Sequence, residues 1–183
     1  MAETATAAHV GTWNVDPSHS GVNFSVKHLG IATVRGTFTE FEGTLELGED
    51  LASSKAYGSV SVASVDTKEA ARDEHLRSAE FFDAENHEKL TFESTEIKPL
   101  DDDELEIHGN LTIHGVTNPV KFKAEITGTE QDPWGNDRVG LEVSGKIARG
   151  EFGMKFNQAL GSGNVMVSDN VKIDLDISAV KAA

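Results

Sequence analysis

Apolar and polar residues alternate with a period of two over most of this 183-residue chain. The alternation is clearest in five runs, at 22–26, 105–113, 120–126, 139–147 and 171–177. Because successive side chains of a β-strand point to opposite faces, each run predicts a strand with one apolar and one polar face. Such strands are typical of antiparallel sheets that bury one face against a core and expose the other to water.

Short turn sequences separate the predicted strands. GVTNP (115–119) and DPWGND (132–137) each join two alternating runs directly, which predicts two hairpins. The parity of the apolar residues changes between Phe38 and Phe41, which predicts a bulge or bend near 39–40. Glycines inside the predicted strands indicate a sheet that curves, and they are Gly36, Gly43, Gly109 and Gly145. Roughly eight or nine strands at this spacing predict an all-β sandwich or barrel.

One segment, ARDEHLRSAEFFDAENH (71–87), lacks the alternation, and a helix is predicted to start there after a capping-box-like pair, Asp66 and Glu69. Asp73 and Arg77 are four residues apart with the acid first, which is the favourable order for an ion pair along a helix. A second helical turn is expected at 79–82. The apolar stripe of the segment is thin, so we expect the helix to lie across one end of the sheet instead of in the core.

The acidic composition narrows the classes of partner. The chain has 16 basic and 31 acidic residues and a net charge of −15. Nucleic acids and anionic lipid headgroups attract basic protein surfaces, so the sequence predicts neither as a partner. The absence of cysteine excludes disulfides and thiol nucleophiles. No stretch approaches the ~20 apolar residues of a membrane span, so we expect no stable membrane insertion.

The length fits a single domain. We expect residues 12–183 to form this domain, after a disordered or extended segment at 1–11. The opening MAETATAAHVGT lacks the basic start and the apolar run of a secretory signal. The expected location is therefore cytoplasmic for the chain as it stands, and secreted or periplasmic if a leader has been removed. The sequence predicts no particular oligomeric state.

Candidate catalytic and metal-binding residues are present, but they form no recognisable pattern. None of the seven histidines belongs to an HxH or HExxH pair. His108 and His114 share a strand face, but they lie ~20 Å apart on an unbroken strand. Asp73, Glu74 and His75 are adjacent, and adjacent helical side chains diverge by about 100°. The sequence also lacks a GxSxG motif. We therefore expect no enzymatic activity, no catalytic residues, no metal site and no cofactor.

The apolar face of the predicted sheet is almost wholly hydrocarbon. From strand parity, the expected wall residues are Val22, Phe24, Val26, Phe38, Phe92, Leu105, Ile107, Phe122 and Leu141. A closed sheet of about eight strands is just wide enough to be filled by its own side chains or to hold one small ligand. A hollow interior would accept an apolar chain, with about 0.8 kcal/mol gained from each buried methylene group. The alternative is a solid core.

Several motifs occur in a distinctive order and spacing between Trp13 and Ile177. They are WNVDPSHSGVNFSVKHLG (13–30), GTFTEFEGTLEL (36–47), SVASVDTKEAARDEHLRSAEFFDAENHEKLTFES (61–94), GNLTIHGVTNPVKF (109–122), DPWGNDRVG (132–140) and RGEFG (149–153). Each is weak alone, but together they resemble the YceI-like family of polyisoprenoid-binding, lipocalin-like proteins. The resemblance implies an extended antiparallel β-barrel of about eight strands, with one or two short helices near a barrel end. It also implies a long apolar pore that holds a polyprenyl-type chain.

We therefore expect a non-catalytic binding or carrier protein for an apolar isoprenoid chain, such as a polyprenyl lipid or the tail of an isoprenoid quinone. One alternative is a metal-assisted hydrolase or isomerase that uses histidines at the barrel mouth. A second is a solid-cored stress or interaction module without a small ligand.

Segment 71–87 is expected to form a lid at the mouth of the pore. Its candidate mouth residues are Arg72, His75, Phe81 and Phe82. In a helical turn the two phenylalanines would point different ways, so that one packs on the sheet and the other meets the pore. The charged residues would contact a polar headgroup or serve only to anchor the helix, with Arg72, Asp73 and Arg77 tying it to neighbouring loops.

Overall fold

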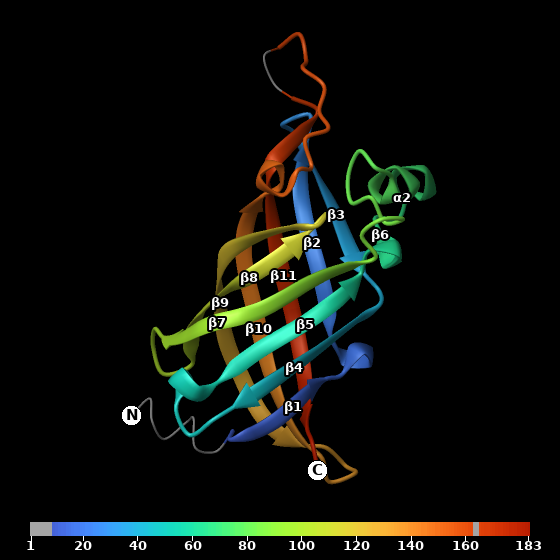
Figure 1. Ribbon diagram of the computed structural model, residues 1–183. Coiled ribbons are helices and arrows are strands. Elements are labelled where there is room, and N and C mark those ends of the chain that lie inside the picture. The colour runs from blue at the N-terminus through green and yellow to red at the C-terminus, as the bar shows by residue number, and fades with distance from the viewer. Residues whose placement is uncertain (1–8, 163–164) are drawn as a thin grey trace.

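The chain forms an antiparallel β-barrel with a helical segment at one end (Figure 1). The computed structural model describes residues 9–162 and 165–183. The strands are β1 (Gly11–Val15), β2 (Gly21–His28), β3 (Ala32–Phe38), β4 (Phe41–Leu47), β5 (Lys55–Ser61), β6 (Val65–Asp66), β7 (Lys89–Pro99), β8 (Glu104–Ile113), β9 (Val116–Gln131), β10 (Asp137–Ala148) and β11 (Val167–Lys181). Helix α2 spans Ala70–Arg77, and short 3₁₀ helices form η1 (Pro17–His19), η2 (Leu51–Ser53), η3 (Val62–Ser64) and η4 (Arg149–Phe152). Residues 1–8 of the predicted N-terminal segment lie outside the described residues, and β1 already begins at Gly11.

Eight strands close the barrel. They follow the order β1-β4-β5-β7-β8-β9-β10-β11, and β11 pairs back onto β1. The pairings around this ring are antiparallel throughout. The predicted all-β antiparallel barrel of about eight strands is therefore confirmed. A closed ring leaves none of these strands as an open edge, because each has a partner on both sides.

Three further strands, β2, β3 and β6, extend the barrel wall beyond the closed ring. Strand β11 is 15 residues long, so one of its edges pairs with β2 over 167–176 and with β1 over 179–181. The bend predicted at 39–40 separates β3, which pairs with β2 and β6, from β4, which pairs with β1 and β5. The change of apolar parity in the sequence therefore marks a change of strand neighbours.

Both predicted hairpins are present. Strands β8 and β9 are joined by His114 and Gly115, whose φ angles are 55° and 73°. Two successive positive φ angles are typical of the tight two-residue turns that suit the twist of a hairpin. Strands β9 and β10 are joined by residues 132–136, within the DPWGND motif.

Helix α2 is fastened to the preceding loop through a buried acid. Asp73 is 7% exposed and accepts hydrogen bonds from the backbone N–H and the hydroxyl of Thr67. Arg77 donates instead to the carbonyl of Ala63. The prediction that Arg72, Asp73 and Arg77 tie the helix to neighbouring loops is therefore confirmed, and the favourable spacing of Asp73 and Arg77 produces no ion pair between them. The capping box predicted at Asp66 and Glu69 is wrong, because the N-cap residue Glu69 makes no side-chain capping hydrogen bond. The second helical turn predicted at 79–82 is also wrong, since this stretch forms a non-helical turn.

The end of the barrel opposite α2, where β1 and the C-terminus lie (Figure 1), is closed by packed side chains. Trp13 is 2% exposed and forms a cluster with Val139, Leu141 and Ala179. Its indole N–H donates to the carbonyl of His9 at 2.7 Å. We call this cluster the Trp13 core. It forms the floor of the barrel.

An arginine outside this floor joins two carboxylates from separate turns. Arg138 donates to Asp16 and to Asp132, each at 2.9 Å. Burial raises the pKa of Asp132, but hydrogen bonds from Asn136 and Arg138 outweigh it and lower the pKa to about 2. Hydrogen bonds from Ser18 and then from Arg138 hold the pKa of Asp16 well below its usual range. Both acids are therefore ionised partners of Arg138 at neutral pH.

Candidate functional site

Between the Trp13 core and helix α2 the barrel contains a partly open cavity of about 640 Å³. This volume lies within the range of about 300–1,000 Å³ that is typical of small-molecule sites. The cavity extends from Leu141 and Ile177, at the Trp13 core, to residues of α2 and of the turn that follows it. The interior is therefore hollow, in contrast to the solid core that the sequence left as an alternative.

The predicted wall residues line this cavity, with one exception. Those that line it are Val22, Phe24, Val26, Phe38, Phe92, Ile107, Phe122 and Leu141. Leu105 packs instead beside Ile97 and Ala124, where it borders a separate cavity of about 50 Å³. Strand parity predicts which face of the sheet a side chain occupies, but not its position along the barrel axis. Leu105 is on the inner face, but it lies too near the floor to reach the main cavity. That the lining residues contact a bound chain stays a prediction.

Three of the lining phenylalanines lie against glycines of adjacent strands. The pairs are Phe24–Gly36, Phe92–Gly109 and Phe122–Gly145, and a Cβ built on each glycine would lie 2.3–2.4 Å from the ring. Non-bonded carbon atoms prefer a separation of about 3.5–4.0 Å, so a side chain at these glycines would displace the ring. Each ring covers the backbone of the neighbouring strand instead of reaching across the barrel. The strand glycines therefore help to keep the interior open.

The α2 end of the cavity is bordered by two consecutive aromatic residues. Phe82 packs edge-on against Phe38, with ring centroids 5.7 Å apart. Phe81 is 7% exposed and packs against the rings of His75 and Phe156. Both phenylalanines line the cavity, so the prediction that only one of them meets the pore is wrong. They lie in a turn instead of a helix, and both can therefore face the cavity.

Polar groups gather at the same end. Arg72 and His75 line the cavity there. Arg72 donates to the hydroxyl and the carbonyl of Thr67, and the ring of His75 pairs with Glu80. These two side chains therefore fasten the helix and border the cavity at the same time, so the two roles considered for them are compatible.

Arg149, which sequence reasoning did not single out, is a third polar group at the α2 end. It is 4% exposed and donates to the carbonyls of Met154, Val167 and Ser168. Burial lowers the pKa of its guanidinium, partly opposed by Asp169. No carboxylate pairs with it among the described residues. Arg149 belongs to the RGEFG motif, which was the only feature of the sequence that drew attention to it. Nothing in that motif indicates that the arginine is buried beside the pore.

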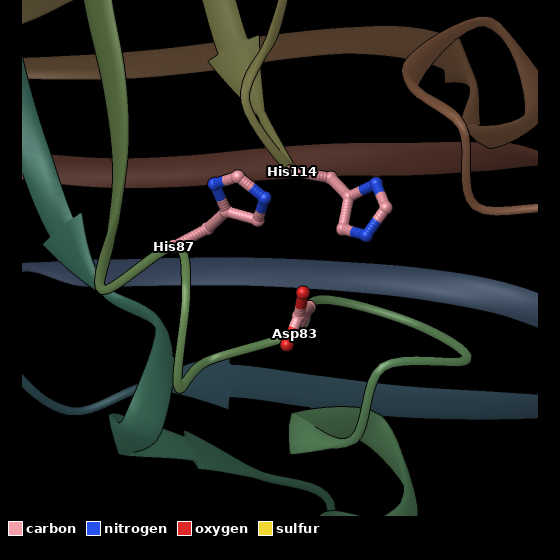
Figure 2. Close-up of side chains that lie close together, drawn as sticks. All are labelled: Asp83, His87 and His114. Atoms are coloured by element: carbon pink, nitrogen blue, oxygen red, sulfur yellow. The ribbon is translucent and has the colours of Figure 1, made fainter.

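A second group that the sequence did not reveal lies on loops outside the cavity lining. Asp83 and His87 come from the loop between α2 and β7, and His114 comes from the β8–β9 turn. Figure 2 shows the two imidazole rings side by side, with one oxygen of the Asp83 carboxylate on the side that faces them. Their potential ligand atoms all lie within 4.8 Å of one another. His87 and His114 are 27 positions apart, so no local motif joins them.

The chain matches the family model described as a YceI-like domain over residues 13–179. The chain belongs to the YceI family. Protein YceI of Escherichia coli O157:H7 is 41% identical over 155 residues, which cover 83% of this chain and 81% of that protein. A UPF0312 protein of Staphylococcus epidermidis is 41% identical over 165 residues, which cover 88% and 93% of the two chains. The predicted family resemblance is therefore confirmed.

Solved structures share the YceI fold. The Campylobacter jejuni YceI protein superposes with a TM-score of 0.74 at 27% identity, covering 86% of this chain and 90% of that one. Burkholderia cenocepacia BcnA gives a TM-score of 0.77 at 22% identity, with 90% and 98% covered. A polyisoprenoid-binding domain from Saccharophagus degradans gives 0.68 at 15% identity, with 93% and 98% covered. In the described residues of our chain, no helix has the length and apolar character needed to cross a membrane.

Proposed function

We propose that this protein binds one apolar isoprenoid chain inside its barrel and carries it without catalysing a reaction on it. The guest would be a polyprenyl lipid or the tail of an isoprenoid quinone. The observation that carries the proposal is the cavity of about 640 Å³ with an almost wholly hydrocarbon lining. Such a lining allows an apolar chain to bury its surface away from water, whereas a hydrophilic ligand would find few hydrogen-bond partners.

The energetic balance favours a chain of several isoprene units. Each buried carbon contributes about 0.8 kcal/mol, so an isoprene unit of five carbons contributes about 4 kcal/mol when fully buried. The loss of translational and rotational freedom on binding costs about 4–15 kcal/mol. About four buried units therefore offset even the upper bound of this cost. Binding of this kind needs no ion pair.

The polar end of the guest would lie toward α2. The opposite end of the cavity is closed by the Trp13 core, whereas Arg72, His75 and Arg149 border the end near the helix. A hydroxyl, phosphate or quinone head could accept hydrogen bonds from these groups, and the chain would extend toward the Trp13 core. This orientation follows from the cost of burying a polar head without partners.

The comparisons support the same class of ligand. The Saccharophagus degradans neighbour is described as a polyisoprenoid-binding domain, and the family match covers nearly the whole barrel. The carrier role rests on the cavity and on this class of relative. Transport between membranes or enzymes is the corresponding biological activity that we propose.

A binding titration with a fluorescent polyprenol tests the proposal. The delipidated protein should bind one chain per molecule, and Phe24→Asp should abolish binding because it places a carboxylate in the hydrocarbon wall. Val26→Phe, which stays apolar but narrows the cavity, should weaken binding without introducing a charge.

Ser25→Asp is the matched control for Phe24→Asp. Ser25 precedes Val26 on the same strand, outside the cavity lining, and pairs with Arg35 and Lys172 on the neighbouring strands. An aspartate at this position gains two basic cross-strand neighbours, so the variant should fold and bind normally. Normal binding by a folded Phe24→Asp variant would contradict binding within the barrel.

A further inference from the structure

Asp83, His87 and His114 bring three potential metal ligands together at the end of the barrel that carries α2 (Figure 2). Two separate segments supply them, the α2–β7 loop and the β8–β9 turn. The two imidazole rings lie 5.1 Å apart between centroids and are steeply tilted to each other. All three residues are partly buried, so water reaches the group and a cation can do so as well.

The ring nitrogens of these two histidines lack a hydrogen-bond partner within the part of the chain that the structure describes. Three other histidines, His19, His75 and His108, each pair with a neighbouring carboxylate. His87 and His114 instead face each other. No lysine or arginine of the described residues forms an ion pair with Asp83. Its carboxylate accepts hydrogen bonds of 3.0 and 3.1 Å from the Asn86 amide, which orients it without neutralising its charge.

The surrounding backbone leaves room for both rings. A Cβ at Gly115 would lie 2.7 Å from Cε1 of His87, so only a glycine in the hairpin turn lets this ring lie against it. Asp83 and His114 both adopt positive φ angles, 52° and 55°. Asparagine adopts such angles more readily than most other residues, and it can therefore replace either one with little backbone strain.

We propose that Asp83, His87 and His114 form a binding site for a divalent transition-metal ion of the Zn²⁺ class. Two imidazoles and one carboxylate are a ligand set that zinc accepts, with water at the fourth position. Oxygen-seeking ions such as Ca²⁺ need six to eight oxygen ligands, which this group does not offer. The net charge of −15 favours the approach of any cation, but the imidazoles select zinc over calcium.

Binding requires only a small contraction of the group. Zinc–nitrogen distances of about 2.0–2.1 Å in a tetrahedral site place neighbouring ligand atoms about 3.4 Å apart. The ligand atoms now lie within 4.8 Å of one another, and side-chain rotation in two loops can close the difference.

A bound ion would cross-link the α2–β7 loop to the β8–β9 hairpin. The cavity-lining Phe82 directly precedes the ligand Asp83, so the cross-link would fix the loop that borders the cavity. The site itself does not depend on the proposed lipid ligand, and it can be tested on protein with or without a guest.

Zinc titration of the untagged, chelator-treated full chain, in competition with a chromophoric chelator, tests the site. We expect one Zn²⁺ per chain with a Kd in the micromolar range or below. At a hundredfold excess over the Kd, Zn²⁺ should raise the Tm by about 5–10 °C. His114→Asn and Asp83→Asn should fold normally and bind Zn²⁺ at least about tenfold more weakly, because each removes one ligand.

His108→Gln is the matched control, because it removes a histidine that is paired with Glu106 away from the group, and it should bind Zn²⁺ as the unmodified chain does. Equal affinity of the His114→Asn variant and the unmodified chain would overturn the site. The site would also be overturned if no Zn²⁺ bound when free Zn²⁺, corrected for the chelator, was in 100-fold excess over the protein. Ca²⁺ binding as tight as Zn²⁺ binding would overturn it too, because it would indicate general attraction of cations to the acidic surface. Zn²⁺ binding does not depend on lipid binding, so a failure to bind polyprenol would leave the expected Zn²⁺ results unchanged.

Discussion

Phe24 on β2 and Gly36 on β3 face each other in register, and the ring of Phe24 occupies the space where a side chain on residue 36 would lie. The backbone of Gly36 is buried. The ring therefore lies against the neighbouring strand and forms part of the cavity wall. This relationship recurs at Phe92 and Phe122 and helps to explain how a barrel rich in phenylalanine keeps an open interior.

Gly36→Ala is expected to push the Phe24 ring into the cavity, because the new Cβ would lie 2.3 Å from the ring. The overpacking should lower the free energy of unfolding by about 1–3 kcal/mol and weaken polyprenol binding. Adding Phe24→Leu should restore part of both losses, since the smaller side chain removes the clash. Urea unfolding and the fluorescent polyprenol titration measure these effects. Gly161→Ala, where a Cβ would meet no atom within 4 Å, should change neither the stability nor polyprenol binding. Equal losses in Gly36→Ala and Gly161→Ala would contradict the role of the Phe24–Gly36 contact.

Trp13→Ala should remove the floor of the barrel. Trp13 is 2% exposed, and truncation of a buried aromatic side chain costs about 3–5 kcal/mol. The free energy of unfolding, measured by urea denaturation and followed by far-UV circular dichroism, should fall by that amount. Trp134→Ala provides the control, because Trp134 is 82% exposed, and its replacement should change the stability by less than about 0.5 kcal/mol. Comparable losses for the two tryptophans would show that the Trp13 core does not close the barrel.

Asp73→Ala should loosen helix α2 by leaving the buried N–H and hydroxyl of Thr67 without their acceptor. An unsatisfied buried donor costs about 1–3 kcal/mol. Amide hydrogen exchange should accelerate in 67–77 more than in the barrel strands. Glu74→Ala removes the adjacent, exposed carboxylate and should leave exchange unchanged. Uniform acceleration throughout the barrel by Asp73→Ala would contradict local anchoring.

Acid should weaken the link that Arg138 makes to Asp16 and Asp132. Both carboxyl pKa values are lowered in the folded chain, that of Asp132 to about 2, compared with about 3.9 in an unfolded chain. Their contribution to stability is therefore present above pH 4 and is lost as the pH falls from about 4 through 2. Urea unfolding of an Arg138→Met variant should show lower stability at pH 7 and a smaller decline between pH 4 and pH 2. A decline as steep as that of the unmodified chain would exclude this link as its source.

The sequence predicted the barrel and most of its cavity wall because apolar and polar residues alternate between the inner and outer faces of each strand. Val22, Phe24 and Val26 needed only alternation to be placed on the inner face. Alternation carries no information on height, which is why Leu105 was assigned to the wrong cavity. It also carries no information on contacts between loops, and Asp83 and His87 therefore gave no signal of their approach to His114.

The α2 segment was the least predictable part for a related reason. Its residue types indicated a helix near the barrel end, and α2 is present at 70–77. The spacing of Asp73 and Arg77 suggested a pair along the helix, but the buried donors of Thr67 compete for the same carboxylate. A buried acceptor satisfies donors that water cannot reach, and that gain outweighs an exposed ion pair.

Mass spectrometry of organic extracts from protein purified out of its native cells shows whether the barrel holds an apolar chain. We expect a hydrocarbon-chain lipid of isoprenoid type at close to one molecule per barrel, and its loss from the Phe24→Asp variant purified in parallel. An extract free of such a lipid, from protein that also fails to take up added polyprenol, would contradict the claim that the hollow barrel serves to hold an apolar chain.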